Sequence, residues 1–143
     1  MSITTIENQI EVLVNEVTDI SKCYTYPVSE LGRSLPALII IYNGISQGYE
    51  AVKQTATTYN FEFTLYENAE GRTLENNWDK LKNYATDILD KFRANPSLNG
   101  TVWNSIITSG ETIIIKESGG SRIEGRPKYV AHTFSLAATQ TEI

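Results

Sequence analysis

His132 is the only histidine in the chain, and a Ser-His-Asp or Cys-His catalytic site would have to be built around it. Counting in twos along a strand places this histidine on one face with Val130, Phe134 and Leu136. The sequence has no G-x-S-x-G nucleophile signature. We therefore interpret His132 as a hydrogen-bonded histidine of the sheet or an interface, and we expect no enzymatic activity. Cys23 is the only cysteine and has no second Cys or His near it, so neither an internal disulfide nor a metal site is expected.

The glycine-rich segment 118–127 has the composition of a phosphate-binding loop but not its pattern. It lacks the Gly-Lys-Ser/Thr ending and lies between predicted strands rather than before a helix. We interpret it as a hairpin loop whose two arginines either contact carboxylates of a neighbouring protein or stay solvated, and both readings remain open. The candidate protein-interface residues are the charged side chains of this loop and of the proline-bounded loop 27–36, namely Glu30, Arg33, Arg122, Glu124 and Arg126.

Acidic residues of the predicted second helix do not form a recognisable metal or glycosidase site. Asp79, Asp87 and Asp90 lie among polar neighbours on the presumed solvent face. Asp87 and Lys91 have the spacing of a surface ion pair, worth a few tenths of a kcal/mol. The net charge of −5 argues against a protein that grips nucleic acid, because such work needs clustered Lys and Arg. The charge remains compatible with a protein wall past which DNA slides without being bound. No cofactor is expected.

Length and composition indicate one globular domain over residues 1–143. Hydrophobic residues make up 41% of the chain and charged residues 20%, which is ordinary globular usage. The longest apolar run, Ala37 to Tyr42, is far shorter than the roughly 20 residues that cross a bilayer. The N-terminus lacks a basic-then-apolar signal pattern. We expect a soluble protein with no membrane partner, made in the cytoplasm.

Two segments have the periodicity of amphipathic helices. Thr4 and Glu7 form a capping box at the start of the first. Val12 lies off its apolar stripe, and we favour an isolated exposed valine over an interface residue. The second helix follows a Gly71-Arg72 turn and ends at Asn95-Pro96. The two apolar stripes are Ile3, Ile6, Ile10, Leu13, Val17 and Ile20, and Leu74, Trp78, Leu81, Ala85, Ile88 and Phe92.

The other segments read as strands. Residues 37–42 form a continuously apolar strand, and Asn43-Gly44 and Gly48 suit a reversal of direction. Alternation over 49–67 predicts a hairpin or one long bent strand. Further strands are expected at 101–108, 111–117 and 128–138, with a turn at Ser109-Gly110 and a polar C-terminal tail at about 139–143. The order predicts an α+β domain, with a mainly antiparallel or mixed β-sheet and two amphipathic helices packed on one face.

The order of these elements resembles the tail terminator, or tail completion, proteins of long-tailed bacteriophages, and the resemblance runs through nearly the whole chain. It is a match of pattern and order, with no invariant catalytic signature. The residues that carry it are Tyr24-Thr25-Tyr26-Pro27, Leu35-Pro36-Ala37 with the strand to Tyr42, Phe61-Glu62-Phe63-Thr64-Leu65-Tyr66, Gly71-Arg72, Phe92-Arg93-Ala94-Asn95-Pro96, Leu98-Asn99-Gly100-Thr101-Val102, and Tyr129-Val130-Ala131-His132-Thr133-Phe134-Ser135-Leu136.

The resemblance implies a structural virion protein of the tail and neck region. Such a protein forms a hexameric ring on the head-proximal end of the tail tube, ends tail polymerisation and offers a docking surface to the head-tail connector, with no cofactor and no reaction. Its partners would be itself, the tail tube protein and the connector, and DNA would pass through the lumen without specific binding. Sheet edges, the two long loops and the polar tail are candidates for the two different patches that a ring needs. The alternatives are another neck or tail tube protein, or a small cellular binding module or an enzyme with a site built from loops.

Overall fold

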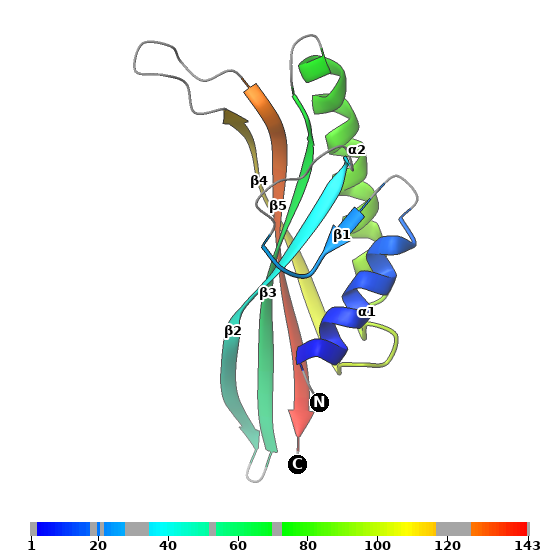
Figure 1. Ribbon diagram of the computed structural model, residues 1–143. Coiled ribbons are helices and arrows are strands. Elements are labelled where there is room, and N and C mark those ends of the chain that lie inside the picture. The colour runs from blue at the N-terminus through cyan, green and yellow to red at the C-terminus, as the bar shows by residue number, and fades with distance from the viewer. Residues whose placement is uncertain are drawn as a thin grey trace, which may run out of the picture.

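A five-stranded sheet carries both helices on one of its faces (Figure 1). The computed structural model describes residues 3–17, 20, 22–27, 35–51, 54–69, 73–116 and 127–142. The elements are α1 (Ile3–Asn15), β1 (Lys22–Tyr24), β2 (Ala37–Ala51), β3 (Gln54–Asn68), α2 (Thr73–Arg93), β4 (Asn104–Lys116) and β5 (Pro127–Glu142). Their order across the sheet is β1-β2-β3-β5-β4, with β1 parallel to β2 and all other neighbours antiparallel. The predicted α+β class is confirmed.

Large apolar side chains spaced two residues apart form the face of the sheet beneath the helices. On β3 and β5, Phe61 lies opposite Leu136 and Phe63 opposite Phe134. All four are almost completely buried. Cross-strand pairs of this kind hold the strands in register, because a slip of one residue would turn every one of them to the other face.

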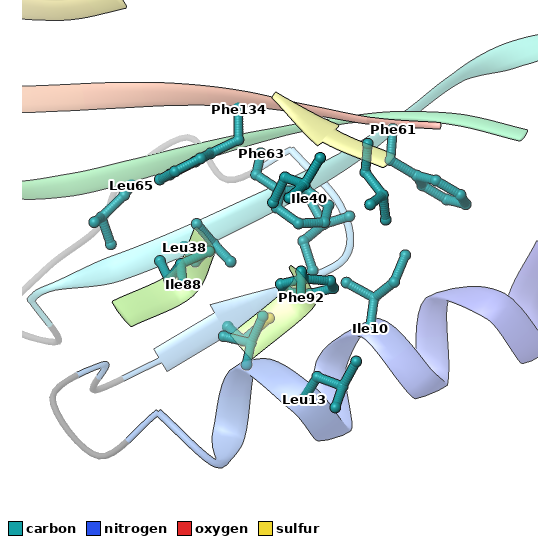
Figure 2. Packing of buried hydrophobic residues seen from close by; sticks show 14 of the residues in the cluster. Ile10, Leu13, Leu38, Ile40, Phe61, Phe63, Leu65, Ile88, Phe92 and Phe134 are labelled. Atoms are coloured by element: carbon teal, nitrogen blue, oxygen red, sulfur yellow. The ribbon is translucent and has the colours of Figure 1, made fainter. Parts of the chain in front are cut away.

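Both helices bury residues of the apolar stripes that their periodicity predicts, although α1 ends at Asn15, before the last two residues of its stripe, Val17 and Ile20. Phe92 of α2 packs on Phe63 of β3, with the ring centroids 5.3 Å apart, at the centre of the core (Figure 2). Helix α1 begins at Ile3, one residue before the expected cap residue Thr4. The helical residues with almost no exposed surface are Ile6, Ile10, Leu13 and Val14 in α1, and Leu81, Ile88 and Phe92 in α2. Each such side chain contributes roughly 1.5–3 kcal/mol by leaving water.

The reversal expected at Asn43-Gly44 does not occur there. Strand β2 continues to Ala51, with a register shift between Tyr42 and Gly44, and the chain reverses between Ala51 and Gln54. Gly44 has φ 127°, a conformation that glycine adopts without strain. A glycine in a β-bulge and a glycine in a turn meet the same local requirement, so the sequence signal is the same for both.

The same correction applies to Ser109-Gly110, which is a bulge rather than a turn. The two strands expected at 101–108 and 111–117 are one strand, β4, with a register shift between Ser109 and Thr112 against β5. This strand starts later than predicted, at Asn104, because residues 96–103 form turns and bends in which Leu98 and Asn99 have positive φ.

The predicted polar tail at 139–143 is part of the sheet as far as Glu142. Strand β5 stays paired with β3 to its end, and the Thr139 and Thr58 hydroxyls lie 3.0 Å apart in a hydrogen bond. Residues 139–142 are all polar, so they lack the alternation of apolar and polar residues that predicts a strand. Their pairing with β3, which is distant in sequence, makes them part of β5.

The sheet is longer than the helical layer. The far ends of β2, β3 and β5 extend beyond α1 (Figure 1). Among the described residues, no helix has the length and apolar character needed to span a membrane.

Replacing Ile10 with alanine should lower the free energy of unfolding by about 2–5 kcal/mol, because it opens a cavity between α1 and the sheet. Val12→Ala on the same helix is the matched control, since Val12 is 44% exposed and should change stability by no more than about 0.5 kcal/mol. Urea unfolding followed by circular dichroism measures both. Equal losses in the two variants would contradict the described orientation of α1.

Candidate interaction surfaces

The five charged residues predicted as interface candidates, Glu30, Arg33, Arg122, Glu124 and Arg126, lie outside the described residues. The structure therefore places none of them and brings none of them together. The surfaces that it does describe are the faces and edges of the sheet and the outer surface of the helices.

Strand β4 forms one edge of the sheet and pairs only with β5 in the part of the chain that the structure describes. It is 13 residues long. Ile106 is 61% exposed on this strand, and Trp103, directly before it, is 63% exposed. Edge strands present unpaired N–H and C=O groups, and apolar side chains beside them favour pairing with another strand.

The opposite edge is stepped. Strand β1 covers β2 only at Ala37–Ile39, so within the described chain β2 has no neighbour on that side from Ile40 to Ala51. Ile45 is half exposed on this open part. Of the seven large hydrophobic residues exposed in the described chain, five lie on the two edges or at their start: Ile45, Trp103, Ile106, Ile113 and Ile114. The two edges therefore hold most of the exposed large apolar side chains of the described chain.

His132 is hydrogen-bonded inside the sheet, as predicted, and both partners come from the edge strand. Its Nε2 lies 2.6 Å from the Ser109 hydroxyl and its Nδ1 lies 2.7 Å from the Thr112 hydroxyl. A neutral imidazole donates from one nitrogen and accepts at the other, so one hydroxyl accepts and the other donates. The ring also packs edge-on against Phe134 with centroids 4.8 Å apart. Burial lowers the pKa of His132, which favours this neutral form.

The bulge explains why one histidine reaches two hydroxyls three residues apart. Residues 109 and 112 would face opposite sides of a regular strand, and the bulge turns both toward His132. The Ser109 contact has the distance of a nucleophile–base pair, but the second nitrogen meets a threonine hydroxyl and not the carboxylate that would stabilise an imidazolium. The arrangement is suited to a structural role, in which His132 holds together the two residues on either side of the bulge.

Gly110 fits the bulge because β4 approaches β5 closely there. A Cβ at this position would lie 2.2 Å from the Thr133 Oγ1 atom. That oxygen accepts a hydrogen bond from the Glu111 backbone N–H at 3.1 Å. The glycine therefore lets a side chain of β5 bind a backbone group of the bulged strand, which fixes the bulge in place.

No protein-family model and no curated protein matches the sequence. The function is therefore inferred from the described surfaces and from the residue pattern of the chain.

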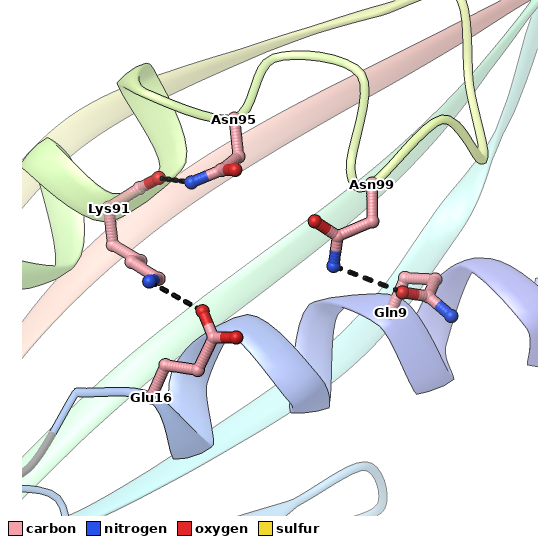
Figure 3. Close-up of polar contacts among 5 residues, drawn as sticks. All are labelled: Gln9, Glu16, Lys91, Asn95 and Asn99. Atoms are coloured by element: carbon pink, nitrogen blue, oxygen red, sulfur yellow. Dashed lines mark hydrogen bonds and ion pairs between the residues drawn. The ribbon is translucent and has the colours of Figure 1, made fainter.

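The helical surface carries ion pairs that differ from the predicted one. Lys91 pairs with Glu16, directly after α1, rather than with Asp87 (Figure 3). The Asn99 amide donates to the Gln9 side chain at 3.2 Å. The first contact joins α2 to the residue after α1, and the second joins α1 to the turn after α2. The side chains of both are exposed or partly exposed, so each contact adds little to stability.

The described residues contain no group of three His, Cys, Asp or Glu side chains that could hold a metal ion. Burial raises the pKa of the Cys23 thiol to about 12, with a smaller contribution from the negative charge of Glu11. The thiol therefore stays protonated at neutral pH and is a poor nucleophile.

The free energy of unfolding should fall as the pH drops below about 6.5, because the unfolded chain protonates His132 near that value and the folded protein does so only at lower pH. Comparing the wild type with His132→Gln by urea unfolding from pH 8 to pH 5 isolates this contribution. The pKa of Glu7 is raised by burial, which gives a slope of opposite sign that is common to both proteins and cancels in the difference. Identical pH dependence in the two proteins would rule out the described environment of His132.

Proposed function

We propose that this protein is a structural virion subunit that caps the head-proximal end of a phage tail tube as a hexameric ring. In that place it ends tail polymerisation and provides the docking surface for the head-tail connector. The observation that carries the proposal is the pair of unlike sheet edges, β4 and the open part of β2, which hold most of the exposed large apolar side chains of the described chain.

A closed ring needs two different patches that meet head to tail, and these edges differ in sequence and shape. A twofold dimer would instead use one patch twice. The resemblance of the residue pattern to tail terminator proteins supports the same conclusion from the sequence side.

Charge agrees with a lumen through which DNA passes. The chain carries a net charge of −5, and a wall of low positive charge releases few counterions and holds phosphates weakly. The proposed partners are other copies of the chain, the tail tube protein and the connector. The protein would be made in the host cytoplasm and reside in the neck region of the virion.

A tail tube protein is the nearest alternative, since it would use the same kind of edges. The difference lies in the end product, because a tube protein polymerises without limit whereas a terminator forms closed rings. For an enzymatic role, the described group to test is His132, and its replacement with alanine would then abolish the activity.

Purified protein mixed with its tail tube protein should give closed rings of about 96 kDa, six times the 16.0 kDa chain, on the tube ends. Native mass spectrometry and negative-stain electron microscopy measure the ring size and its position. Phage made without the protein should contain tails of abnormal length or tails not joined to heads. Indefinite filaments of this protein, or normal joined particles in its absence, would refute the proposal.

A further inference from the structure

We infer that neighbouring copies join by strand pairing, with Asn104–Ser109 of β4 in one copy antiparallel to Ile40–Ser46 of β2 in the next. The sheets of the ring would then form one continuous wall. The number of copies in that wall rests on the proposed function. The contact between two copies rests instead on the strand directions, on the exposed side chains and on the heights of the facing residues, meaning their positions along the strands.

Strand directions make this pairing antiparallel. Strand β3 runs opposite to β2, β5 opposite to β3, and β4 opposite to β5, so β4 runs opposite to β2. Rotation about a ring axis keeps the axial direction of every copy. The β4 edge of one copy therefore meets the β2 edge of the next in the antiparallel sense, which is the slightly more stable of the two ladders.

The heights of the two open edges match. Across the sheet, Ile40 is aligned with Ser109 through Phe63 and Phe134, and Ser46 is aligned with Asn104 through Thr58 and Thr139. Pure rotation brings together positions of equal height, and the tilt of strands in a closed wall shifts them by a few residues. These two segments therefore face each other to within a few residues of register.

The step in one edge coincides with the bulge in the other. Strand β1 ends its pairing at Ile39, one position from Ile40. The bulge in β4 begins at Ser109, which has the height of Ile40. A bulge bends its strand, so β4 changes course where the facing edge gains the extra strand β1. The two edges have complementary outlines as well as complementary directions.

Each segment carries one large exposed apolar side chain. Ile45 of β2 is half exposed and lies on the helix-bearing face of the sheet, since it pairs with Tyr59 of the core. Ile106 lies on the other face at the height of Gly44, which has no side chain. Pairing would cover Ile45 on one face and seat Ile106 over the glycine on the other.

Cysteine crosslinking tests the contact directly. Ser105 has the height of Ile45, so Ser105→Cys combined with Ile45→Cys should give a covalent ladder of oligomers on mild oxidation in the presence of the tail tube protein. Combining Ser105→Cys with Tyr42→Cys covers a small shift of register. The native Cys23 stays protonated and does not compete. Ile113→Cys with Ile45→Cys is the matched control and should give no ladder, because Ile113 lies beyond the bulge.

A charge at the contact gives a second test. Ile106→Lys should abolish the ring species in native mass spectrometry and leave the melting temperature of the subunit unchanged, and Val12→Lys on α1 should leave the rings intact. Rings that form without crosslinks would overturn this contact and leave the proposed function standing. Covalent dimers from Ser105→Cys alone would show twofold β4 pairing and overturn it too. Absence of any oligomer with the tail tube protein would overturn both proposals.

Discussion

The main core, on one face of the sheet, determines the architecture of this protein. Apolar residues occupy alternate positions along parts of β2, β3 and β5, and both helices cover the face that results, while a smaller cluster around Ala37 and Ile39 lies apart from it. A sheet longer than its helical layer keeps its ends and edges open, because two helices cannot reach them (Figure 1). The open edges are therefore a consequence of how the helices cover the core.

Periodicity predicted the parts of the fold that depend on local pattern. The apolar stripes of the two helices, such as Ile6 to Leu13 and Leu81 to Phe92, and the alternation from Tyr59 to Leu65, each indicate burial on one face, and predicting them requires no knowledge of the packing partners. The bulges at Gly44 and Gly110 were misread as turns because a glycine accepts both conformations. What separates the two cases is a strand that lies far away in the sequence, such as the one that carries Thr133 beside Gly110.

The residues exposed on the sheet edges cannot be predicted from the sequence for the same reason. An isoleucine in a strand is expected in the core, and only the strand order reveals that Ile106 lies on the outermost strand with its side chain exposed. The sequence predicts charged loop residues as interface candidates, whereas the structure shows exposed apolar residues on regular elements. The face on which His132 lies follows from counting in twos, but its two hydroxyl partners depend on the bulge.

The bulge in β4 also bears on misassembly inside a crowded cell. A flat and uninterrupted apolar edge is a template for cross-β stacking, which grows without limit. The bulge at Gly110, held by the hydrogen bonds of His132, divides the strand into a segment of six residues, Asn104–Ser109, and one of five, Thr112–Lys116. Because a bulge bends its strand, a flat cross-β partner could not pair with both segments at once, and this works against fibril growth along the whole strand.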